Sequence, residues 1–113
     1  MQPYRYQQEL DIYNEAQAAA AKATQEYLDA GHHWYPCGFS WVRIRPAIGR
    51  FVTMCKDQKL GRTDDFEGGF VIYNPSGNST QSMDAKKAGA DAFVAVMKKH
   101  YSTMKISAQT RID

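Results

Sequence analysis

The sequence has few cysteines and none of the common metal spacings. Only Cys37 and Cys55 occur among its 113 residues, which excludes the disulfide scaffold that supports many small secreted domains. Neither C-x-x-C nor H-E-x-x-H is present, so the strongest zinc signatures are missing as well. We expect both cysteines to be free, buried thiols in a reducing compartment.

Long apolar runs and a strong charge imbalance are also missing. No segment approaches the roughly 20 apolar residues that span a bilayer, and residues 1–8 lack the apolar centre of a signal peptide. We therefore expect a cytoplasmic protein without a membrane partner. The net charge is only +2, well short of the basic excess that is typical of dedicated nucleic-acid-binding domains. The length fits one domain, residues 1–113, and is short for two.

Two stretches have the spacing of amphipathic helices. Residues 4–30 are rich in alanine, start after a proline and end at Gly31, which predicts one long helix. Residues 82–101 begin with Ser82 as a helix cap and contain Gly89, which we expect to mark close packing. The alanine stripe predicts a helix packed on a sheet; the alternative is a seam for self-association.

The segments between and after these helices have the patterns of strands and turns. Residues 38–56 alternate around a proline- and glycine-containing turn, which predicts a β-hairpin. Residues 57–69 are polar and predict an exposed loop. Residues 70–73 predict a short strand, and 105–108 either add another strand or stay loose. The order α-β-β-β-α(-β) predicts an α+β fold, with a small antiparallel sheet of three to four strands and two helices on one face.

The first of these strands carries the main candidate site. Successive side chains of a strand point to opposite faces, so Gly38 to Arg45 separates an aliphatic face from one with two aromatic rings and two arginines. Rings that face solvent can stack nucleobases, and arginines can bind phosphates. The alternative is that the rings cover the core and the arginines only reach solvent at the strand end. The residues of this candidate face are Phe39, Trp41, Arg43 and Arg45.

Three further residues are candidates for phosphate contacts. Arg50 follows the predicted turn of the hairpin, and the turn at 74–82 leads into a helix N-terminus, where anions bind readily. Ser82 and Lys86 lie at that helix start. The alternative for the turn is a plain helix cap without a ligand.

Metal binding and catalysis have weaker support. The acidic residues of 57–69 can hold a hard cation, but a solvated loop is the simpler explanation, because such loops are normally polar. No segment has the pattern around an activated nucleophile, so we expect no catalytic residue, and we expect no cofactor. Zinc accepts several side chains of this chain as ligands, although a histidine pair at a helix end and two buried thiols explain them as well. These side chains are His32, His33, Cys37, Cys55 and His100.

Residues 32–52 and 81–100 resemble segments of small uncharacterised proteins encoded by tailed bacteriophages, marine ones in particular. The resemblance implies a viral accessory protein that acts in a bacterial cytoplasm, and it transfers no functional residue. The sequence thus predicts a small binding protein for a nucleotide or a single-stranded nucleic acid. The alternative is a dimeric protein–protein interaction module, or an inhibitor of a host protein, with Trp34, Tyr35 and Trp41 as interface anchors.

Overall fold

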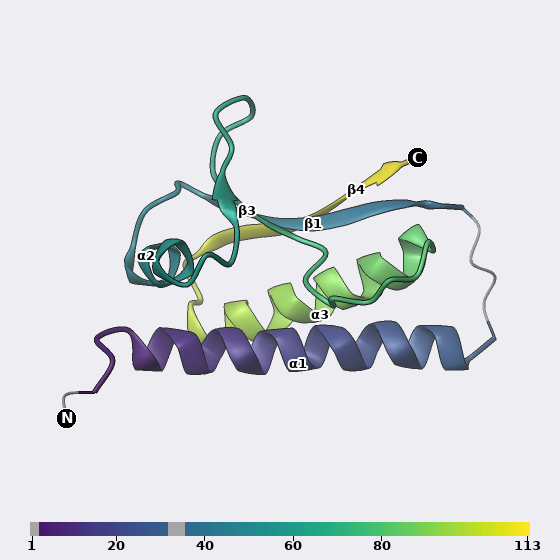
Figure 1. Ribbon diagram of the computed structural model, residues 1–113, viewed down its shortest axis with the longest axis horizontal. Helices are drawn as coiled ribbons and strands as arrows, with labels where there is room; N and C mark the ends of the chain where they lie inside the picture. Colours follow the sequence, from purple (N-terminus) through teal and green to yellow (C-terminus); the bar gives the residue numbers. More distant parts are fainter. Residues whose placement is uncertain (1–2, 32–35) are drawn as a thin grey trace.

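The computed structural model describes residues 3–31 and 36–113. The strands in these ranges form one antiparallel sheet, in the order β2 (Arg62–Thr63), β3 (Phe70–Tyr73), β1 (Gly38–Arg45) and β4 (Lys105–Ile112). Figure 1 labels β1, β3 and β4 of this sheet. Within the described ranges, none of the helices is both long enough and apolar enough to cross a membrane. The elements in chain order are α1 (Gln7–Asp29), β1 (Gly38–Arg45), α2 (Arg50–Asp57), β2 (Arg62–Thr63), β3 (Phe70–Tyr73), α3 (Met83–His100) and β4 (Lys105–Ile112).

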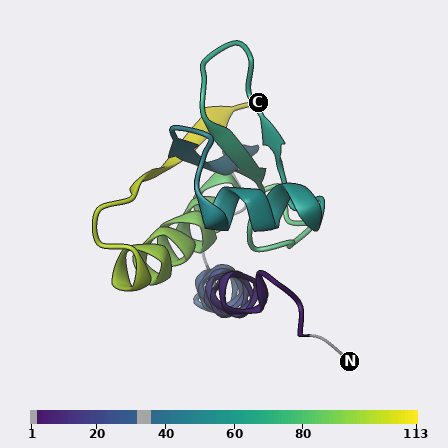
Figure 2. The same ribbon diagram turned by 90° about the vertical axis from the view of Figure 1, so that its left-hand side faces the viewer.

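The helices lie on one side of the sheet, which confirms the predicted α+β class. Figure 2 shows α2 and α3 next to the sheet, with α1 running across their outer side. The core between these layers is formed by side chains from every helix and from β1, β3 and β4. Its largest fully buried apolar side chains are Phe70, Phe93, Met54, Met97, Val42 and Val52.

The alanine stripe of α1 packs against α3. Ala16 and Ala20 have no exposed surface, and the Thr24 hydroxyl donates a hydrogen bond to the Ala85 carbonyl oxygen at 2.7 Å. A Cβ atom on Gly89 of α3 would lie 3.0 Å from the Ala20 carbonyl oxygen, so this glycine does mark a close approach. Ala16 and Ala20 are covered by α3 of the same chain, so they are not available to a second copy. The self-association seam is wrong for this part of the helix.

The predicted hairpin over 38–56 is wrong in its second half. Its first half is β1, but Arg50–Asp57 is the helix α2. The buried residues of this segment are Phe51, Val52, Met54 and Cys55, a spacing of one, three and four that places them on one side of a helix. The alternation that suggested a strand was a weaker pattern than this helical one.

Two other boundaries differ from the prediction. The predicted loop 57–69 contains the two-residue strand β2, which pairs with β3, and the C-terminal strand extends from the expected 105–108 to Ile112. The observed order is therefore α-β-α-β-β-α-β. From β1 onward it is the β-α-β-β-α-β connectivity of the split βαβ motif, with α1 as an addition in front.

Candidate ligand-binding face

The sheet surface that points away from the helices carries a group of aromatic rings. Phe39 and Trp41 lie on β1, and Tyr73 lies opposite Trp41 on β3. The Trp41 and Tyr73 rings are almost parallel, with an interplanar angle of 5° and centroids 6.2 Å apart. The Phe39 centroid lies 6.1 Å from that of Tyr73. We call these three residues the aromatic face.

The alternate residues of β1 point into the core. Ser40, Val42 and Ile44 are buried, as the aliphatic pattern predicted. The interpretation in which Phe39 and Trp41 cover the core beneath the helices is therefore wrong. The two rings are half-buried, and Tyr73 is 58% exposed.

A hollow of about 440 Å³ lies beside the aromatic face. One wall is the aromatic face, and another is the β2–β3 hairpin, residues 62–73, which projects from the sheet on the side away from the helices (Figure 1). Arg62 and Arg111 also line it. Its volume lies within the range of small-molecule sites, and its walls combine ring surfaces with arginines and with the carboxylates of Asp64 and Glu67.

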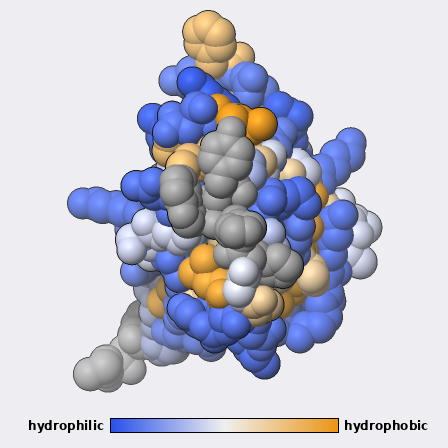
Figure 3. Space-filling model, turned by 90° about the vertical axis from the view of Figure 1, so that its right-hand side faces the viewer, coloured by the Kyte–Doolittle hydropathy of each residue, from blue (hydrophilic) through white to orange (hydrophobic). Residues whose placement is uncertain are grey.

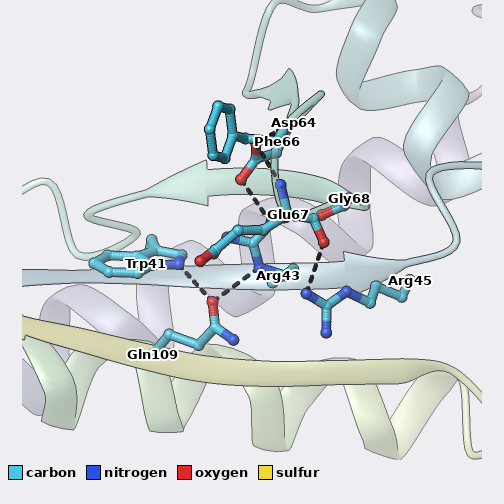
Figure 4. Close-up of polar contacts among 8 residues, drawn as sticks. All are labelled: Trp41, Arg43, Arg45, Asp64, Phe66, Glu67, Gly68 and Gln109. Atoms are coloured by element: carbon cyan, nitrogen blue, oxygen red, sulfur yellow. Dashed lines mark hydrogen bonds and ion pairs between the residues drawn. The ribbon is translucent and has the colours of Figure 1, made fainter.

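Arg43 fixes the base of the hairpin to the sheet. Its side chain is only 3% exposed, and it lies between the hairpin and β4 in Figure 4. The guanidinium donates to Asp64 at 2.8 Å and to Glu67 at 2.9 Å, and also to the Gly68 carbonyl oxygen. We call Arg43 and these hairpin residues the arginine cluster. The carboxylates of Asp64 and Glu67 already bind the Arg43 guanidinium, so it is not available to a phosphate.

The arginine cluster also sets the protonation state of Asp64. The hydrogen bond from Arg43 lowers the pKa of this carboxyl to about 2, and the backbone N–H groups of Phe66 and Glu67 contribute in the same direction. The Asp64 Oδ1 atom accepts from these two N–H groups at 2.9 and 3.2 Å. Asp64 therefore keeps its charge further into the acid range than an ordinary aspartate, and it accepts the hydrogen bonds that hold the hairpin turn.

Gln109 connects the arginine cluster to the aromatic face. Its Oε1 atom accepts from Trp41 Nε1 at 2.7 Å and from Arg43 Nε at 2.9 Å (Figure 4). Gln109 and Tyr73 were missed as site residues. They come from strands far along the chain, and only the register between β1, β3 and β4 shows that they join Trp41.

The other predicted site residues are spread over the molecule. Arg45 donates to the Glu67 carbonyl oxygen at 3.0 Å, so it lies beside the arginine cluster. Lys86 reaches the edge of the aromatic face, with Nζ 5.4 Å from the Phe39 centroid and a hydrogen bond to the Gly38 carbonyl oxygen.

Arg50 and Ser82 are not part of this face. Arg50 begins α2 and pairs with Glu9 of α1, with 3.4 Å between Nη2 and Oε1. Ser82 is fully buried and caps α3, because its hydroxyl accepts from the Ala85 N–H. That hydroxyl serves the helix, which is the alternative considered for the 74–82 turn.

The three zinc-ligand candidates that the structure describes, Cys37, Cys55 and His100, have separate surroundings. His32 and His33 lie outside the described residues. Cys55 is fully buried, and burial raises the pKa of its thiol to about 12, while Cys37 lies near Gln81 and His100 contacts Glu15. Among residues 3–31 and 36–113, no group of three or more histidine, cysteine or acidic residues is arranged to hold a metal ion.

The chain has no match among known protein families, curated proteins or solved structures. The resemblance of two of its segments to small phage proteins stays a prediction.

Proposed function

We propose that the aromatic face binds a nucleotide or a short single-stranded nucleic acid by stacking bases on Trp41 and Tyr73. One observation carries the proposal: neighbouring aromatic rings lie on the two central strands of a four-stranded sheet, on the side that the helices leave open. RNA-recognition modules stack two or three bases on aromatic residues of a four-stranded sheet in this way. Their glycine-aromatic strand signature is not present here, so the support is geometric.

The phosphate contacts in this proposal differ from those that the sequence alone indicated. Arg43 is already neutralised by Asp64 and Glu67, so its role is to position the hairpin and, through Gln109, the Trp41 ring. Arg62 and Arg111 lie on the rim of the hollow and have exposed side chains. They are the cations that a phosphate backbone would meet while a base rests on the rings.

The proposal is tested by the fluorescence anisotropy of labelled DNA and RNA octamers at low salt. Each stacked base contributes about 1–3 kcal/mol, so Trp41→Ala and Tyr73→Ala should each weaken binding by a factor of about 5 to 150. Arg62→Ala combined with Arg111→Ala should make the salt dependence of the dissociation constant less steep. Lys22→Ala, on the exposed side of α1, is the control and should leave both quantities unchanged.

Two results would contradict this function. The first is that the wild-type protein binds neither octamer nor a mononucleotide. The second is that the control variant weakens binding as much as Trp41→Ala, because binding would then be a non-specific attraction to positive charge.

A second candidate function is contact with another protein through the hairpin. Phe66 is 98% exposed and points out from the hairpin in Figure 4, and the projecting end of the molecule in Figure 3 is apolar. Exposed aromatic residues are common anchors of protein interfaces. Because Phe66 also lines the hollow, the two functions are separated by Trp41→Ala, which should weaken octamer binding and leave capture of a protein partner unchanged. Phe66→Ser should abolish that capture.

A further inference from the structure

The strand β4 has one paired edge and one free edge. It pairs with β1 along its whole length, from Gly38 opposite Ile112 to Arg45 opposite Lys105, and it is the last strand of the sheet. Figure 2 shows it along one side of the sheet. In the part of the chain that the structure describes, no strand pairs with its outer side. Such an edge presents backbone donors and acceptors that can pair with another strand.

The register with β1 shows which groups face outward. The Asp113 N–H donates to the Cys37 carbonyl oxygen at 3.1 Å, so the backbone of Asp113 points to β1. The direction of the backbone N–H and C=O groups alternates along an antiparallel strand. The backbone groups of Gln109 and Lys105 therefore point to β1, as those of Asp113 do. The outward groups therefore belong to Ile106, Ala108, Thr110 and Ile112.

We propose that this free edge pairs antiparallel with the same edge of a second copy of the chain. The hydrogen-bond pattern requires outward-pointing residues to lie opposite each other, so even-numbered residues meet even-numbered ones. Residues opposite each other share one face of a sheet. The helices of both copies then lie on the same side of a continuous sheet, and a slip by one residue, which would reverse the faces, is excluded.

The charges at the ends of β4 select one register. With Gln109 on the two-fold axis, Lys105 of each copy lies opposite Asp113 of the other. Ile106, which is buried, lies opposite Ile112, which is 66% exposed. A shift of the partner by two residues would instead place Lys105 opposite Arg111, and like charges directly across a sheet are unfavourable.

The same two charges argue against the alternative that Lys105 is there only to prevent this edge from pairing with another strand. Lysine on an edge strand commonly prevents pairing, but here an acidic residue is placed to neutralise it in the pair. Neither the Lys105 ammonium nor the Asp113 carboxylate has a partner among the described residues. In the proposed dimer, Lys105 and Asp113 lie opposite each other at a non-hydrogen-bonded position. Side chains on neighbouring strands approach most closely at such positions.

The test is a charge exchange followed by sedimentation velocity over a series of protein concentrations, without nucleic acid. The wild type should form a concentration-dependent dimer. Lys105→Asp alone and Asp113→Lys alone each create two like-charge contacts and should raise the dimer dissociation constant about tenfold or more. The double variant Lys105→Asp/Asp113→Lys should return to the wild-type value.

The control is Lys59→Asp, which makes the same charge change on an exposed residue outside the sheet and should leave the dimer unchanged. A wild type that stays monomeric at every concentration overturns the proposal and leaves the edge to a strand from a different protein. A double variant as weak as the single ones overturns the register. Because octamer binding is measured separately, either failure leaves the proposed function of the aromatic face standing.

Discussion

The side chains on the two faces of β1 are held in place in different ways. Val42 and Ile44 point to the helices and are at most 2% exposed, and they need only packing partners. Trp41 and Arg43 point the other way, and each is held by hydrogen bonds to Gln109. The covered face is stabilised by burial of apolar surface, whereas the open face is organised by polar contacts around a charge.

This difference indicates where function is located. Large aromatic side chains that remain accessible, and a charged side chain that is almost fully buried, are the informative departures from ordinary burial. Both departures occur on the open face, and they are adjacent. The covered face follows the usual rules of a core, so the two faces should respond differently to substitution.

The largest effect is expected beneath the covered face. Phe93 of α3 has no exposed surface and its ring packs against Tyr13 of α1. Phe93→Ala should lower the free energy of unfolding by about 3–5 kcal/mol, because it removes buried surface and leaves a cavity. Chemical denaturation followed by circular dichroism measures this loss. A change below that for Arg43→Ala would contradict the assignment of the main core to this side.

A smaller loss of stability is expected in the arginine cluster. Arg43→Ala leaves Asp64, Glu67 and Gln109 without their shared donor and should lower the free energy of unfolding by about 2 kcal/mol. Hydrogen exchange of the hairpin amides should become faster at the same time, because the hairpin loses its attachment to β1. Arg45→Ala removes one exposed bond to the hairpin and is the matched control. Equal effects of the two variants would show that Arg43 is not the anchor.

The arginine cluster also predicts a dependence on pH. Asp64 has a pKa of about 2 in the folded protein against an ordinary value of 3.8. A depressed folded pKa stabilises the folded state above the unfolded pKa, and this advantage is lost as pH falls from about 4 to about 2. In the Asp64→Asn variant, the free energy of unfolding should therefore change less steeply with pH in that range. Asp65→Asn, at an exposed neighbour, should keep the wild-type slope.

The smallest effect on stability is expected at the aromatic face. Tyr73 is 58% exposed, so Tyr73→Ala should change the free energy of unfolding by about 0.5 kcal/mol or less. Thermal unfolding measures this change. A loss comparable to that of Phe93→Ala would mean that the ring serves the core, and it would remove the distinction between the two faces.

Much of the fold could be predicted from local patterns. The long alanine-rich helix, the helix that starts after Ser82 and the strand at 70–73 all have strong signals of period or capping. The segment Arg50–Asp57 was assigned wrongly because its apolar residues satisfy two periods at once over a short length. Packing of Phe51 and Met54 in the core decides between them, and a single sequence does not reveal that packing.

The candidate site could be predicted only in part. Alternation along β1 correctly separated Trp41 and Arg43 from the aliphatic face, because side-chain direction in a strand is a local property. The ion pairs of Arg43 join residues 21 and 24 positions apart, and Gln109 is 66 positions from Arg43. Such partners are brought together by the sheet register, and no local sequence pattern predicts these contacts.

The packing of α1 has a consequence for the synthesis of the chain. Its contacts reach far ahead: Thr24 bonds to Ala85, 61 residues later, and Glu15 bonds to Lys99, 84 residues later. A ribosome therefore releases α1 well before α3 exists to receive it. An alanine-rich segment of 23 residues has the length and the intrinsic propensity to form helix without tertiary support. The small side chains that permit close packing in the finished protein thus also favour helix formation in the nascent segment.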